Sequence, residues 1–88
     1  MQARSYQTVL QETTAIIARF CKAEVTEHTH LLRDLDLDSL GVAELVAEIE
    51  DHFDVMIPMK ILPELRSVAD TARCLTALLD AEADGPRP

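Results

Sequence analysis

The stretch LDLDSLGVAELVAEIEDHFDVMIP, residues 35–58, decides the fold of this chain of 88 residues. Its apolar side chains recur at steps of three and four from Ser39 to Asp54, which is the period of an amphipathic helix. Asp38 stands at the N-cap position, where its carboxylate can accept from a free backbone amide. Pro58 turns the residue before it away from helical backbone, so the helix should end ahead of it. The expected apolar stripe consists of Leu45, Val46, Ile49 and Phe53.

Two further helical patterns flank this helix. The same period recurs over residues 4–22 and again over residues 67–79. Ser67 opens the second pattern with a capping box in which Asp70 is the returning acid. No alternating apolar pattern of useful length predicts a strand. We therefore expect an all-α fold, a small four-helix bundle with three longer helices and one short helix.

The connecting and terminal segments carry weaker signals. Residues 59–65 are interrupted by Pro63, so they have room for one or two helical turns. Residues 23–38 show no clean period, and we expect a long loop that leucines anchor to the core. These leucines are Leu31, Leu32, Leu35 and Leu37. We also expect Met56 to belong to the core, and Met59 and Ile61 to belong to the core or to its partly exposed cover. Residues 81–88 offer no apolar content to bury and should form a disordered tail.

Composition limits the classes of function. A chain of 88 residues is one small domain, and one Tyr, two Phe and no Trp predict an aliphatic core. Sixteen acidic against eight basic side chains give a net charge of -8, which argues against nucleic acid and for partners with basic surfaces. No signal-peptide core and no apolar run long enough for a bilayer is present. We expect a free-standing cytoplasmic monomer that binds neither nucleic acid nor membrane.

The two cysteines, Cys21 and Cys74, have neither a CxxC nor a metal-ligand spacing. Both fall on apolar faces of expected helices. Because cytosolic thiols stay reduced, we expect two buried free thiols.

The aspartates before the serine could open a calcium loop, since Asp34, Asp36 and Asp38 alternate as its first ligands do. The rest of the register fails. The sixth position is Ser39 where a glycine is needed, and the twelfth is Leu45 where a bidentate glutamate is needed. The pattern therefore does not predict a calcium site.

The histidines supply neither a metal site nor a general base. A hydrolytic Ser39 would need a base within hydrogen-bond reach. His52 lies further along the same expected helix, about 20 Å away at a rise of 1.5 Å per residue. His28 and His30 stand in a polar loop with no third ligand nearby in sequence. We expect no catalytic residue and no metal, and hence no enzyme.

The decisive stretch resembles the acyl carrier protein family around its phosphopantetheine attachment site. The matching motifs are Asp38-Ser39-Leu40, Glu44-Leu45-Val46, Phe53-Asp54 and Ile57-Pro58, and the likeness covers about residues 31–79. It implies an acyl carrier domain over residues 1–80 whose Ser39, flanked by Asp38 and Leu40, is esterified by a 4'-phosphopantetheine arm from coenzyme A. Acyl intermediates are then held as thioesters on the arm. A phosphopantetheinyl transferase would supply the base for the attachment.

Acidic residues gather around the attachment motif. Residues 34–59 contain eight acids and no Lys or Arg, whereas a merely solvated face would more often mix signs. We therefore expect an acidic docking surface for partner enzymes with basic surfaces. The resemblance implies acyltransferases, ketosynthases or ligase-type enzymes as these partners. The expected partner-binding residues are Asp36, Leu40, Ala43, Glu44, Ala47, Glu50 and Asp51.

Several positions depart from the family's pattern. Gly41 stands where fatty-acid carriers commonly have an acid, and Leu37 replaces a residue that is often small. Lys60 and Pro63 alter a third helix that is usually acidic and unbroken. These departures favour a discrete carrier of specialised, polyketide-type biosynthesis over housekeeping fatty-acid biosynthesis. A free-standing aminoacyl or peptidyl carrier is the nearest alternative, and an unmodified helical interaction module is another.

Overall fold

The computed structural model of the chain describes residues 5–84, with the side chains of residues 5–81. It contains three α-helices, α1 (Tyr6–Cys21), α2 (Ser39–Phe53) and α3 (Val68–Asp84), and one 3-10 helix, η1 (Met59–Glu64). Over these residues the secondary structure is helical apart from one isolated β-bridge between His30 and Ser67. The prediction of an all-α bundle with three longer helices and a short one is confirmed.

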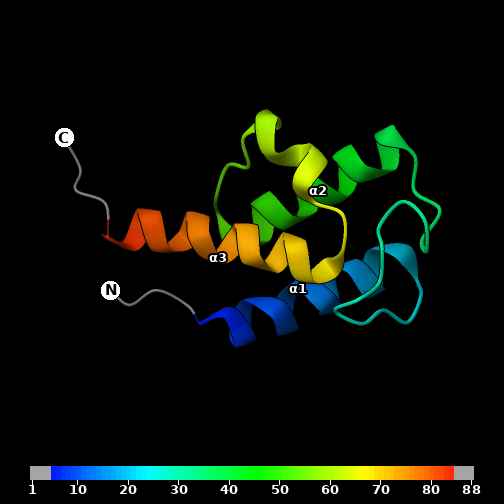
Figure 1. The fold of residues 1–88 in the computed structure, drawn as a ribbon, viewed down its shortest axis with the longest axis horizontal. Helices are drawn as coiled ribbons and strands as arrows, with labels where there is room; N and C mark the ends of the chain where they lie inside the picture. Colours follow the sequence, from blue (N-terminus) through cyan, green and yellow to red (C-terminus); the bar gives the residue numbers. More distant parts are fainter. Residues whose placement is uncertain (1–4, 85–88) are drawn as a thin grey trace.

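The helices form two levels. Helices α1 and α3 lie side by side along the long axis and run in opposite directions, α2 lies above them, and η1 lies at the top of the view (Figure 1). The C-terminal end of α1 and the N-terminal end of α2 lie at the same end of the bundle (Figure 1). The long loop that joins them therefore stays at that end and delivers Ser39 there.

The core between these helices is aliphatic, as the composition predicts. All four members of the expected α2 stripe are buried, and its Leu45 and Ile49 are each only 1% exposed. Each large aliphatic side chain moved from water to such a core contributes about 1.5–3 kcal/mol. The other buried hydrophobic residues are Val9, Ile16, Ile17, Leu31, Val55, Ile57, Leu65, Val68, Ala69, Ala72 and Leu75.

Only part of the leucine anchoring in the long loop is as expected. Leu31 is buried, and Leu35 and Leu37 are half-buried against the core. Leu32 is 52% exposed, so its prediction as an anchor is wrong. The cause is a turn, closed by the Asp34 amide donating to the His30 carbonyl at 2.9 Å. This turn directs Leu31 toward the core and Leu32 toward solvent.

Backbone hydrogen bonds attach the loop to the start of α3. The Leu31 amide donates to the Arg66 carbonyl at 2.8 Å, and the Val68 amide donates to the Thr29 carbonyl at 3.0 Å. The Ala69 amide donates to the Glu27 carbonyl at 2.9 Å. These bonds satisfy amides that a helix start otherwise leaves free. The loop is therefore an ordered part of the bundle.

The capping box predicted at Ser67 and Asp70 is confirmed. The Asp70 amide donates to Ser67 Oγ at 3.1 Å, and the Ser67 amide donates to Asp70 Oδ2 at 3.2 Å. Burial by itself would raise the pKa of Asp70, but the hydrogen bonds from Ser67 and the Arg73 guanidinium outweigh it and hold that pKa below its usual value. The ionised carboxylate thus stabilises the fold at neutral pH, and this contribution is lost as the pH falls through the lowered pKa.

Both terminal boundaries differ from the sequence prediction. Ser5 caps α1, which begins at Tyr6 rather than at residue 4. Helix α3 continues to Asp84, so the expected disorder is wrong for residues 81–84. That expectation considered only burial, whereas Ala and Glu in this segment are strong helix formers. The rest of the expected tail, residues 85–88, lies outside the described residues.

None of the helices in the described part of the chain is long and apolar enough to span a membrane.

Two buried threonines provide a test of the core. The Thr13 hydroxyl has no hydrogen-bond partner among the described residues, whereas the Thr71 hydroxyl donates to the Ser67 carbonyl at 3.0 Å. Thr13→Val should therefore raise the free energy of unfolding by about 1 kcal/mol, because it removes an unsatisfied buried hydroxyl without changing the shape. Thr71→Val is the matched control and should not stabilise. Urea unfolding of both variants measures the difference, and equal effects would contradict the assignment.

Candidate functional site

The start of α2 presents Ser39 in the open. Ser39 is the first residue of α2, and its side chain is exposed. Asp38 is the N-cap, as predicted: its Oδ1 accepts from the Gly41 amide at 2.7 Å, and its carbonyl accepts from the Val42 amide at 2.9 Å. No described residue accepts from the amides of Ser39 and Leu40. Two free N–H groups therefore lie beside the hydroxyl, at the positive end of the helix dipole.

Helix α3 shows the contrast. Its first amides are all occupied: two donate to carbonyls of the long loop, and two donate to Ser67, at Oγ and at the backbone carbonyl. A ligand would have to displace protein groups there. At the start of α2 a ligand would displace only solvent. Of these two helices, α2 is therefore the one whose first amides are free to bind a ligand.

The residues before the N-cap shape the approach to Ser39. Asp36 is exposed and has a φ of 57°, a left-handed conformation that aspartate tolerates better than most residues. Asp34 is occupied inside the loop, where its Oδ2 accepts from the His30 amide at 2.8 Å. After the serine, Leu40 is 67% exposed. An exposed leucine and an exposed aspartate thus lie on either side of the hydroxyl in sequence.

Neither the aspartates nor the histidines assemble a metal site in the described part of the chain. No three His, Cys, Asp or Glu side chains there come together in a way that could hold a metal ion. The His30 ring accepts from the Arg33 amide at 3.1 Å, in the loop. The His52 ring lies 3.0 Å from Glu12 Oε1 and edge-on to the Phe53 ring. The hydrogen bonds and ring contacts of both these histidines are with residues other than Ser39.

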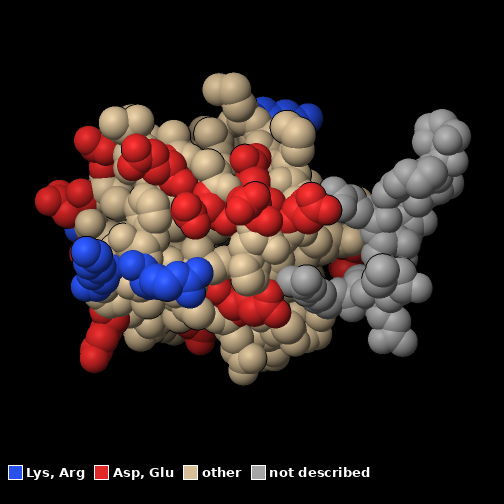
Figure 2. All heavy atoms as spheres, turned by 180° about the vertical axis from the view of Figure 1, so that it is seen from behind, with Lys and Arg blue, Asp and Glu red and all other residues tan. Residues whose placement is uncertain are grey.

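Most of the expected docking residues are exposed along α2. Ala43, Glu44, Ala47 and Asp51 are all exposed, and so is Glu48, which the sequence prediction did not include. Figure 2 shows Asp and Glu side chains as a band across the rear face, at the level where α2 lies in Figure 1, with a group of Lys and Arg below one end. Glu48 could have been found from its spacing of four residues from Glu44.

Glu50 does not belong with this exposed set. Its side chain is half-buried, and its Oε2 accepts from the Ile57 amide at 2.7 Å. It ties the end of α2 to the extended segment before η1, so its expected role as a free docking carboxylate is corrected to one in holding the fold.

Two methionines on either side of Ile57 are exposed, so the prediction that Met56 belongs to the core is wrong, and Met59 is more exposed than the partial exposure allowed for it. Met56 is 81% and Met59 is 82% exposed, while Ile57 between them is buried. Extended backbone before η1 explains the exposure of Met56, because successive side chains there point to opposite sides. Met59 is the first residue of η1, a 3-10 helix in which no residue is buried.

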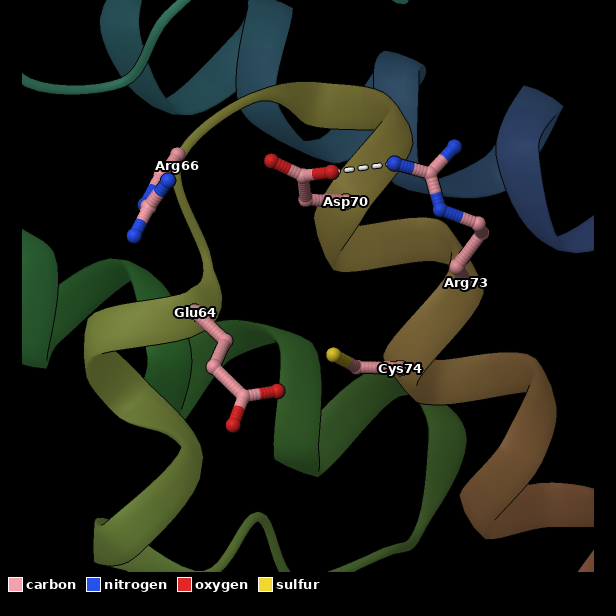
Figure 3. Close-up of a pocket in the computed structure, with 5 residues that line it drawn as sticks. All are labelled: Glu64, Arg66, Asp70, Arg73 and Cys74. Atoms are coloured by element: carbon pink, nitrogen blue, oxygen red, sulfur yellow. Dashed lines mark hydrogen bonds and ion pairs between the residues drawn. The ribbon is translucent and has the colours of Figure 1, made fainter.

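Both cysteines are free and half-buried, rather than fully buried as expected. Cys74 lines a pocket of about 340 Å³ together with Glu64, Arg66, Asp70 and Arg73, and Figure 3 shows its thiol pointing from α3 toward the side that carries Glu64. Burial and then the carboxylates of Glu64 and Asp70 raise the pKa of Cys74, and Arg73 opposes them. Burial also raises the pKa of Cys21. Both thiols therefore favour the protonated form.

Comparison with known families decides the class of the chain. Residues 11–75 match the family model described as the phosphopantetheine attachment site. The chain belongs to the acyl carrier protein family. Acyl carrier proteins carry this cofactor rather than catalyse a reaction, and the expected phosphopantetheine cofactor is confirmed by the family match.

Relatives in several organisms bear the same family name. The chain is 41% identical over 58 residues to the mitochondrial acyl carrier protein of Saccharomyces cerevisiae, which covers 66% of this chain and 46% of that protein. It is 34% identical over 55 residues to a probable acyl carrier protein of Caulobacter vibrioides, covering 62% of this chain and 64% of the relative. It is also 34% identical over 70 residues to a meromycolate extension acyl carrier protein of Mycolicibacterium aurum, covering 80% of this chain and 68% of the relative. The matched part thus spans about half to two thirds of these acyl carrier proteins.

The raised pKa of Cys74 can be measured by alkylation. In a Cys21→Ser background, iodoacetamide should modify Cys74 more slowly than free cysteine at pH 8, because only the thiolate reacts. The rate should rise with pH through a midpoint above the usual thiol value. Glu64→Gln removes one of the carboxylates that raise this pKa and should speed the reaction at pH 8. Glu24→Gln, an exposed change in the long loop, is the control, and equal rates in both variants would contradict the assigned cause.

Proposed function

We propose that the chain is an acyl carrier whose Ser39 hydroxyl bears the 4'-phosphopantetheine arm. The observation that carries this proposal is that the region matched by the family contains two serines, Ser39 and Ser67. Ser67 is half-buried, and its hydroxyl is occupied in the capping box of α3. Ser39 is exposed. It is therefore the serine in that region that a transferring enzyme can reach.

The surroundings of Ser39 fit a phosphodiester. Such a group would lie beside the free amides of Ser39 and Leu40, where a helix N-terminus favours a negative charge by about 0.3–1 kcal/mol. The first turn of α2 contains no acid, unlike that of α3, which contains Asp70. Asp36 and Asp38 oppose the anion electrostatically. Asp38 has the compensating role of capping the helix that presents the serine.

The attachment needs no base on this chain. Ser39 Oγ would bond to the phosphorus next to pantetheine in coenzyme A, and the bond from that phosphorus to the bridging oxygen would break. Adenosine 3',5'-bisphosphate would leave, and the hydroxyl proton would pass to a base of the phosphopantetheinyl transferase. When attached, the arm supplies a thiol that holds acyl groups as thioesters. What Ser39 contributes is exposure on a rigid helix start.

The proposed docking face combines carboxylates with small and apolar side chains. It consists of Asp36, Leu40, Ala43, Glu44, Ala47, Glu48 and Asp51. Its charge fits enzymes with basic surfaces, namely the transferase and acyltransferase, ketosynthase or ligase-type enzymes. The exposed Leu40 is the best-placed apolar contact.

The proposal also covers the setting in which the carrier works. We place it in the cytoplasm, as a monomer serving specialised, polyketide-type biosynthesis. The polyketide-type pathway is supported by Gly41, by Leu37 and by the third helix, which is a 3-10 helix with Pro63 inside it. The acyl group found on the protein isolated from its host would distinguish this setting from fatty-acid biosynthesis and from an aminoacyl carrier.

Intact-mass spectrometry tests the attachment site. After incubation with coenzyme A, magnesium and a phosphopantetheinyl transferase, the wild-type chain should gain the mass of one arm, and Ser39→Ala should gain none. Ser67→Ala is the matched control and should still accept the arm, although loss of the cap should lower its stability by about 1 kcal/mol. An arm that persists in Ser39→Ala would refute the assignment.

Charge reversals separate the docking carboxylates from the structural one. Glu44→Lys combined with Asp51→Lys should slow arm transfer about tenfold at low salt, through a weaker electrostatic encounter, and leave the unfolding free energy nearly unchanged. Glu50→Lys should instead cost about 1.5–3 kcal/mol of stability, because it removes a charge-assisted hydrogen bond. Glu24→Lys, with the charge change of a single reversal at a position away from α2, is the control. Transfer rates across a salt series and urea unfolding measure the two effects, and identical behaviour of Glu44 and Glu50 would contradict the division.

A further inference from the structure

Gly41 lies where a side chain would crowd its neighbours. A β-carbon built on it would stand 3.1 Å from Leu37 Cδ2 and 3.3 Å from Asp38 Oδ1. Gly41 lies in helical backbone without a positive φ, so it is the lack of space, and not the conformation, that suits glycine there. The large side chain of Leu37 therefore occupies space that a side chain at position 41 would need, and glycine at position 41 leaves that space free.

Both neighbours of Gly41 are held by other contacts. Leu37 and Val42 occupy the N' and N4 positions of α2, the pair that forms a hydrophobic staple, and both pack against the core. Asp38 Oδ1 is the atom that accepts from the Gly41 amide at 2.7 Å. A side chain at position 41 would press on the staple and on the cap at the same time.

We propose that Leu37 and Gly41 act together as positioning residues that set where the Ser39 hydroxyl stands for arm transfer. This inference rests on the proposed function of Ser39. The serine lies directly between the cap and the residue that the cap binds, so a displaced cap displaces the first turn of α2. A displacement of about 1 Å in a reacting group can cost about a hundredfold in rate.

The test is a double-mutant cycle with Gly41→Ala, Leu37→Ala and the combined variant. The first readout is kcat/KM for arm transfer by a purified transferase from coenzyme A, followed as intact mass. Gly41→Ala should lower kcat/KM about tenfold. It should not lower Tm by more than a few degrees, because alanine is the better helix former. The combined variant should return to within about twofold of wild type, because truncation of Leu37 vacates the space.

Stability and positioning are separated by the direction of the changes. Leu37→Ala removes the staple and should lower Tm in the single and the combined variant alike, so the combined variant should be less stable but faster than Gly41→Ala. Ala77→Gly, on the exposed side of α3, is the control: it should lower Tm with no change in kcat/KM.

A second readout does not depend on the arm. The amide NMR signals of Ser39 and Leu40 should shift in Gly41→Ala and move back toward the wild-type positions in the combined variant. Failure of the wild-type chain to accept any arm would refute the proposed function, and these shifts would then still decide the positioning. Equal kcat/KM for Gly41→Ala and wild type, a combined variant as slow as Gly41→Ala, or unchanged amide signals would each overturn the inference.

Discussion

The backbone hydrogen bonds between the long loop and the first turn of α3 are the constraint on which the rest of the structure depends. They hold residues 27–31 against residues 66–69, at the end of the bundle where α1 finishes. From there only a few residues remain before Asp38, so the loop fixes where α2 can begin. The same bonds satisfy the start of α3. One set of interactions thus closes one helix terminus and delivers another that stays open.

How far the sequence predicts this arrangement depends on how local each signal is. The α2 stripe through Leu45 and Ile49, the Asp38 cap and the Ser67 capping box are set by neighbours within one or two turns, and all are found. The exposure of Leu32 depends on a turn, and the hydrogen bond from the Ile57 amide to Glu50 depends on the path of the chain after α2. The spacing of apolar residues predicts neither of them. The helical residues 81–84 show a different limit, since intrinsic propensity there outweighs the lack of apolar surface.

The candidate site follows the same division. Ser39 and its cap were predictable because a motif and a helix start coincide in a few residues. The reason for Gly41 was not, since in sequence it stands only as a departure from a family pattern. In space it is explained by Leu37 and by the carboxylate of its own N-cap. The acid-rich segment likewise predicts a single acidic surface, but the fold divides its carboxylates. Some are exposed on α2, whereas Asp34 accepts from the His30 amide within the loop and Glu50 accepts from the Ile57 amide.

The protonation of the two cysteines has a consequence for cargo. A thioester is open to exchange with any nearby thiolate, and thiolates rather than thiols are the attacking species. Cys21 and Cys74, the two cysteines of the chain, are both biased toward the neutral form, Cys74 partly by the acids that share its pocket. On the proposed function, an acyl group held on the Ser39 arm would exchange only slowly with the chain's own thiols, and its release would depend on a nucleophile supplied by a partner enzyme.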